Sequence, residues 1–210
     1  MRKLAILSPV VFAFLFCAQF ASAQFASDQQ IDLFLGGSTL LSSGSSNASS
    51  NNSGLPAEKG GLYISLGGDA VFLQHHLGIN VETAWRATQG TYVAGAENYR
   101  PILTDFNLLY APRLGKKAGL DLTAGIGAGA TRYYAPGPSC TGCINYVSTD
   151  HFMEHLGAGI RYYPWHHIFV RPEINYYHIQ NNNTFIDNGF NSNNVFRVGA
   201  SIGYTFGGPQ

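Results

Sequence analysis

The C-terminal stretch Phe196-Arg-Val-Gly-Ala-Ser-Ile-Gly-Tyr-Thr-Phe206 alternates apolar residues with small, polar or charged ones. One set comprises Phe196, Val198, Ala200, Ile202, Tyr204 and Phe206, and the other Arg197, Gly199, Ser201, Gly203 and Thr205. Because successive side chains of a strand point to opposite faces, this pattern predicts a strand with one apolar face. At about 3.3 Å per residue and a tilt of roughly 40°, the stretch spans about 25 Å, the height of the apolar band of a membrane barrel.

The same alternation recurs along the chain and predicts eight strands. They cover 29–41, 61–73, 77–88, 99–111, 118–133, 149–163, 168–180 and 194–206. Short connections at 74–76, 112–116 and 164–167 alternate with long polar ones at 42–60, 134–148 and 181–193, and 89–98 is intermediate. This plan is typical of an all-β, eight-stranded antiparallel up-and-down transmembrane β-barrel with both termini at the short-turn end.

Charge decides which face of these strands would contact lipid. The 210 residues include 12 Lys+Arg and 12 Asp+Glu, a neutral balance that argues against a nucleic-acid-binding protein. One strand face carries nearly all the charges: Asp32, Glu82, Arg86, Asp105, Asp121, Arg161, Arg171, Glu173 and Arg197. An apolar outer face is an aggregation hazard in water but is required in lipid, where a charge near the midplane costs about 2–4 kcal/mol. The charged face is therefore expected to line the lumen.

Aromatic residues near the ends of the expected apolar face are candidates for the two interfacial girdles of a membrane barrel. The short-turn end would carry Phe72, Tyr110, Tyr162 and Tyr204, and the long-loop end Trp85, Tyr176 and Phe196.

The N-terminal segment predicts a cleaved secretory signal peptide over residues 1–23. Arg2 and Lys3 precede an apolar run, and Ala21-Ser-Ala23 offers small residues for cleavage before Gln24. The alternative of an uncleaved anchor is disfavoured because the run is short for a spanning helix. We expect the barrel domain to cover 24–206, followed by a short tail at 207–210.

The signal peptide, the eight alternating segments and the closing Gly199-Ala-Ser-Ile-Gly-Tyr-Thr-Phe206 resemble the small outer-membrane β-barrel family, related in plan to OmpA, OmpX and OmpW. Phe169-Val-Arg-Pro-Glu173 is similar to the penultimate strand of many members. The resemblance covers 24–206. It implies a bacterial outer-membrane location, a monomer, contact with outer-membrane lipids including lipopolysaccharide, and insertion by the barrel assembly machinery. The family's assembly signal usually ends at the terminal aromatic residue, whereas Gly207-Gly-Pro-Gln210 follows here.

The cysteines Cys140 and Cys143 lie in the long connection 134–148. A secretory context favours a disulfide between them. Metal binding is the alternative, but a single pair supplies only half of a zinc site. His151 and His155 would lie about 13 Å apart on one strand, too far to share a metal ion. We expect no metal and no cofactor.

The segment His178-Ile-Gln-Asn181 is similar to the His-x-Ser-Asn motif of lipid A deacylases, which are also small outer-membrane barrels. Gln180 occupies the serine position, and an amide cannot act as the hydroxyl nucleophile. The sequence therefore predicts a protein that is not an enzyme, with a deacylase-like activity as a third alternative.

The expected lumen cluster consists of Glu82, Asp105, Asp121, Arg161, Arg171 and Glu173. Counting from the turns places them at comparable height, so both arginines are predicted to pair with these four carboxylates. Because eight strands enclose a space that side chains just fill, the cluster would act as a structural plug or line a narrow gated pore. We accordingly expect a non-enzymatic structural or surface-interaction (adhesin-like) role residing in loops 42–60 and 134–148. The rival is an OmpW-like narrow channel for ions or small solutes.

Overall fold

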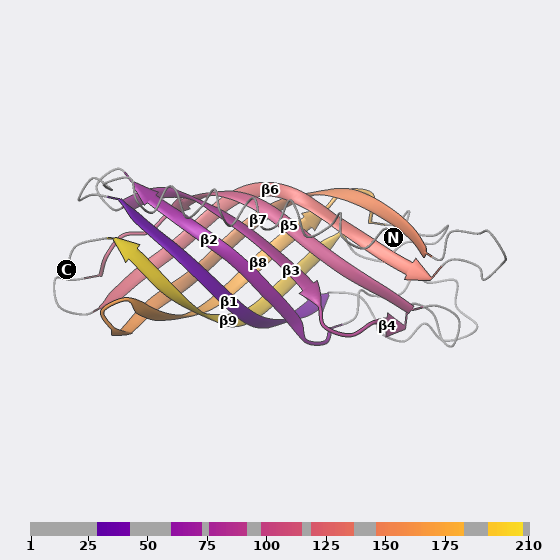
Figure 1. Ribbon diagram of the computed structural model, residues 1–210. Helices are drawn as coiled ribbons and strands as arrows, with labels where there is room; N and C mark the ends of the chain where they lie inside the picture. The colour runs from indigo at the N-terminus through magenta and orange to yellow at the C-terminus, as the bar shows by residue number, and fades with distance from the viewer. Residues whose placement is uncertain are drawn as a thin grey trace, which may run out of the picture.

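The computed structural model describes residues 29–42, 60–72, 76–91, 98–114, 119–136, 146–182 and 193–207. The strands are β1 (Gln30–Ser42), β2 (Tyr63–Phe72), β3 (Leu77–Arg86), β4 (Gly90–Thr91), β5 (Asn98–Tyr110), β6 (Leu120–Pro136), β7 (Tyr146–Trp165), β8 (Ile168–Ile179) and β9 (Asn194–Gly207). Their order is β3-β2-β1-β9-β8-β7-β6-β5-β4, and an additional β3–β5 pairing closes the sheet. Eight long antiparallel strands therefore form a closed barrel, which confirms the predicted fold class (Figure 1).

The first and last strands pair along their whole length, from Gln30–Gly207 at one end of the barrel to Ser42–Val195 at the other. At the Gln30–Gly207 end, Leu77 of β3 pairs with Tyr110 of β5. In Figure 1 the strands run obliquely to the long axis, with the start of β1 and the end of β9 at the same end. Such closure gives each of the eight long strands a partner on both sides, so none of these eight is an open edge. Below, this end is called the short-turn end and the opposite one the long-loop end.

Three features differ from the predicted strand pattern. The two-residue β4 was not expected within 89–98, and it pairs with the beginning of β5. The β6–β7 ladder continues to the pair Pro136–Tyr146, so this hairpin extends further than predicted at the long-loop end. At the other end of β7, the register shifts between Tyr162 and Trp165. The shift brackets Pro164, which cannot donate a ladder hydrogen bond and is tolerated at such a bulge.

The side chains alternate between an apolar exterior and a polar interior. Leu108, Phe106 and Ile126 are 69%, 64% and 60% exposed, whereas Arg161 and Arg197 are fully buried. This inversion of a soluble core confirms the predicted assignment of faces. All seven aromatic girdle candidates lie on the outward face, and Trp165 and Phe206 also point outward near the short-turn end.

The lumen contains three layers along its axis. Buried apolar residues fill the long-loop end: Leu40, Tyr63, Leu103, Met153, Tyr177, Ile179 and Val195. A smaller apolar cluster of Val71, Leu109 and Ala111 occupies the short-turn end. Between them lies a charged layer that contains Arg171, Arg197 and their carboxylates, whereas Gln30 and Asp121 lie beside the short-turn cluster. Within the described ranges, no helix is long and apolar enough to cross a membrane.

Candidate functional site

Arg161 of β7 forms the lower part of the charged layer, toward the short-turn end. Its Nη1 lies 3.0 Å from Asp32 Oδ2, and its Nη2 forms an ion pair with Asp69. The guanidinium also lies 5.6 Å from the centre of the Phe169 ring. Because the carboxylates belong to β1 and β2, which are not neighbours of β7, Arg161 ties together separate parts of the barrel wall.

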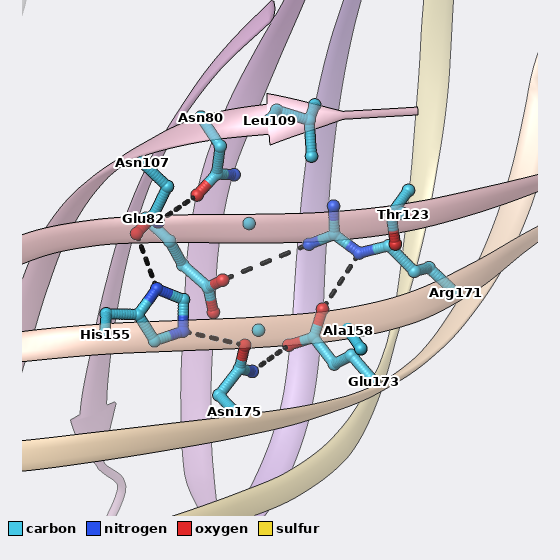
Figure 2. Close-up of a pocket in the computed structure, with 12 residues that line it drawn as sticks. Asn80, Glu82, Asn107, Leu109, Thr123, His155, Ala158, Arg171, Glu173 and Asn175 are labelled. Atoms are coloured by element: carbon cyan, nitrogen blue, oxygen red, sulfur yellow. Dashed lines mark hydrogen bonds and ion pairs between the residues drawn. The ribbon is translucent and has the colours of Figure 1, made fainter. Parts of the chain in front are cut away.

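Arg171 of β8 lies at the centre of the charged layer. Its Nη1 is 3.0 Å from Asp69 Oδ2, and its Nε is 2.8 Å from Glu173 Oε2. Figure 2 shows the guanidinium between Glu173 and Glu82, whose Oε2 is 4.0 Å from Nη2. The Phe34 ring lies 3.9 Å from the guanidinium carbon. That ring occupies the space beside Gly67, where a Cβ atom would lie 2.3 Å from Phe34 Cζ.

Arg197 of β9 links two of the same carboxylates. Its Nη1 is 2.6 Å from Glu82 Oε1, and its Nη2 is 3.4 Å from Glu173 Oε1. Three arginines thus contact four carboxylates drawn from four strands. Each guanidinium therefore has the paired charge that a buried arginine requires.

A row of amides extends the charged layer toward β5. Asn80 donates from Nδ2 to Asp69 Oδ1 at 2.5 Å. Asn107 donates from Nδ2 to Asn80 Oδ1 at 2.7 Å and to Asp105 Oδ1 at 2.5 Å. Each amide nitrogen therefore faces an acceptor, and the row begins and ends at a carboxylate.

His155 continues this row across the lumen, as Figure 2 shows. Its Nδ1 lies 2.5 Å from Asn107 Oδ1, and its Nε2 lies 3.0 Å from Asn175 Oδ1. Asn175 in turn donates from Nδ2 to Glu173 Oε1 at 3.3 Å. The imidazole stacks on the Tyr177 ring, with centroids 4.8 Å apart and planes at 20°.

A small cavity of about 40 Å³ lies within this layer. Its polar lining includes Glu82, Asn107, His155, Arg171 and Glu173 (Figure 2). That volume has room for only a few water molecules. The side chains around this cavity are therefore packed closely and leave little free space at this level of the lumen.

The structure brings together part of the predicted lumen cluster. Arg171 contacts Glu173 and Glu82, as expected. Arg161 contacts neither of these residues, and its prediction is corrected: its ion pairs are with Asp32 and Asp69. Counting from the turns gives the height of a side chain but does not show which residues of the opposite wall its tip can reach.

The other two predicted carboxylates lie apart from the arginine cluster. Asp105 Oδ1 is 3.7 Å from His155 Nδ1. Asp121 Oδ1 is 3.4 Å from Arg113 Nε, near the short-turn end. Asp69 was missed, although it contacts two arginines. A strict period of two through Tyr63-Ile-Ser-Leu-Gly-Gly-Asp69 would have placed it inward, but the two glycines weaken that signal.

His178 of β8 and Gln180, which follows the end of this strand, face outward near the long-loop end. His178 Nδ1 contacts Asn194 Oδ1 at 2.9 Å, and Gln180 Nε2 donates to Glu154 Oε1 at 3.4 Å. The position equivalent to the deacylase serine is thus an amide that hydrogen-bonds a carboxylate. The predicted disulfide between Cys140 and Cys143, the signal peptide 1–23 and residues 208–210 lie outside the described residues.

Comparisons with known proteins agree with this architecture. The attachment invasion locus protein Ail of Yersinia pestis, solved with the heparin analogue sucrose octasulfate, is 14% identical with a TM-score of 0.54, covering 85% of this chain and 98% of Ail. The Neisserial surface protein A is 11% identical with a TM-score of 0.55, covering 86% and 98%. A major outer membrane protein of Thermus thermophilus is 10% identical with a TM-score of 0.57, covering 84% and 99%.

At these identities the likeness shows the fold alone. No curated protein sequence matches the chain. The model of the outer membrane protein β-barrel domain matches residues 9–206, which is nearly the whole chain. The protein therefore belongs to the outer membrane protein β-barrel domain family, whose members lie in the bacterial outer membrane.

Proposed function

We propose that the protein is a non-catalytic surface protein whose barrel is a closed scaffold and whose long connections, 42–60 and 134–148, make contact with external partners. The observation that carries this proposal is the filled lumen. Three paired arginines lie between two apolar layers, and the cavity among them measures only about 40 Å³. Such an interior suits a plug better than a conduit.

The absence of catalysis is part of the proposal. Its support is the chemistry around His178, where Gln180 stands in the place of a nucleophilic serine. An amide nitrogen bound to a carboxylate cannot attack an ester.

The fold neighbours give support by analogy. Ail is described as an attachment invasion locus protein, and Neisserial surface protein A as a surface protein. Function does not follow from fold, so this likeness favours an adhesin-like role without naming a ligand. The proposal also includes export by the cleaved segment 1–23, insertion by the barrel assembly machinery, a monomeric state, and contact with lipopolysaccharide.

The test is a binding assay with loop replacements. Bacteria displaying the protein would be applied to immobilised heparin, laminin and fibronectin. Separate variants would replace 43–59, 137–145 or 183–192 with a short Gly-Ser linker, the last serving as the matched control. The proposal expects the wild type to attach to at least one surface. Replacing 43–59 or 137–145 should abolish this attachment, and replacing 183–192 should not. Heat-modified gel migration should show a folded barrel for every variant. No attachment of the wild type, or attachment kept in all three variants, would refute it.

A further inference from the structure

The lumen holds one histidine whose two ring nitrogens both face amide oxygens. We propose that His155 is held as the doubly protonated imidazolium, and that its two N–H groups link β5, β7 and β8 inside the barrel. This link is called the latch. Raising the pH until the imidazolium loses a proton would loosen the plug.

The Asn107 side chain has a fixed orientation. Its Nδ2 faces Asp105 Oδ1 at 2.5 Å and Asn80 Oδ1 at 2.7 Å. Asn80 must present its oxygen there because its own Nδ2 donates to Asp69. Turning Asn107 over would place its oxygen against a carboxylate and another amide oxygen. Asn107 Oδ1 is therefore the atom that faces His155 Nδ1 at 2.5 Å.

The Asn175 side chain, on the other side of the ring, also has a fixed orientation. Asn175 Nδ2 donates to Glu173 Oε1 at 3.3 Å, so its Oδ1 faces His155 Nε2 at 3.0 Å. Gly157 gives these two side chains room, because a Cβ atom there would lie 2.6 Å from Asn175 Oδ1. A neutral imidazole has one N–H donor and one lone pair, which would oppose an amide oxygen. Glu173 is paired with Arg171 and Arg197, and with this carboxylate ionised only the imidazolium satisfies both contacts.

The surrounding charges favour a cation at this position. Within the described ranges, the titratable and charged groups around the ring are Glu82 on β3, Asp105 on β5, Arg171, Glu173 and Tyr177 on β8, and Arg197 on β9. Asp105 is the nearest carboxylate, 3.7 Å from Nδ1. Among the described residues, none of Arg161, Arg171 and Arg197 forms an ion pair with it. A protonated His155 supplies the missing positive charge.

The position of the ring makes its proton structurally important. Asn107 and Asn175 belong to β5 and β8, which are not neighbours in the sheet. His155 joins them through its two N–H groups, and loss of one proton breaks one of these links. An ordinary histidine, as in the unfolded chain, is neutral well above pH 6.5. A folded barrel that keeps the proton must therefore lose stability as the pH rises.

The direct test is ¹⁵N NMR of the uniformly labelled protein in detergent micelles between pH 6 and pH 9. The ring nitrogens of His155 would be assigned by through-bond correlation to the backbone. At pH 7.5, where an ordinary histidine is mostly neutral, we expect both nitrogens to give protonated signals. One protonated and one bare nitrogen at that pH would overturn the proposal.

A second test uses stability and does not depend on the NMR assignment. The midpoint temperature of heat-modified gel migration would be measured from pH 6 to pH 9. The midpoint temperature of the wild type should fall as the pH rises. His155→Gln should have a lower midpoint at pH 6 and a weaker dependence on pH. His166→Gln, in an exposed turn, is the control and should keep the pH dependence of the wild type. A His155→Gln profile with the full wild-type slope would contradict the latch.

Discussion

Replacing Arg171 with alanine tests the charged layer of the lumen at its centre. The change removes ion pairs of 3.0 Å to Asp69, 2.8 Å to Glu173 and 4.0 Å to Glu82, together with the contact on the Phe34 ring. Breaking one side of a buried ion pair costs about 3–5 kcal/mol. Each of the three carboxylates keeps another arginine, Arg161 or Arg197, so the lower end of this range applies. We therefore expect a loss of about 3 kcal/mol in the free energy of unfolding.

The assay is urea unfolding in lipid vesicles, read by tryptophan fluorescence and by heat-modified gel migration. Arg171→Leu should lose a similar amount because it restores volume but not charge. Val170→Leu is the matched control, since Val170 is one residue away on the outward face and 38% exposed. We expect it to be nearly neutral. Equal stability of Arg171→Ala and the wild type would refute the argument that the ion pairs stabilise the lumen.

The remaining predictions concern topology, the loop cysteines and the lipid face. A protease added outside intact cells should cut only within 42–60, 89–98, 134–148 or 181–193, because barrel strands are paired and embedded in lipid; an external cut at 112–117 or 164–167 would contradict the topology. Cys140 and Cys143 should resist alkylation until a reductant is added, and free thiols in protein isolated from the cell envelope would reject the disulfide. Ile126→Arg should destabilise the barrel by about 2–4 kcal/mol in vesicle unfolding, whereas Gln180→Arg at the membrane edge should cost about 0–1 kcal/mol; equal effects would contradict the assigned depth.

The strands could be predicted because their signal is local and repeated. Alternation along Phe196–Phe206 fixes both the strand and its faces, and the same period recurs in seven other segments. The two-residue β4 carries no such period, and the extension of β6 and β7 depends on pairing between the two strands. Periodicity reports which face a residue occupies, and it does not report how far a ladder continues.

The lumen was predictable only in part, for a geometric reason. Parity placed Arg161 and Arg171 inward, and both are buried. The partners of Arg161 lie on β1 and β2, across the barrel, where sequence distance from a turn gives no guide. His155 was considered only as a metal ligand. The inward parity of His155, Asn107 and Asn175 could have been read from the sequence, but that they face one another and form hydrogen bonds required the folded barrel.

The most direct test of a closed scaffold is single-channel recording of the wild-type protein in a planar lipid bilayer. Because ion pairs and two apolar layers fill the lumen, we expect no steady conductance above the bare membrane, and a measurable conductance only when Arg171→Ala removes part of the charged layer. A wild-type protein that conducts steadily, with Arg171→Ala changing only its ion selectivity, would contradict the plug and identify a channel instead.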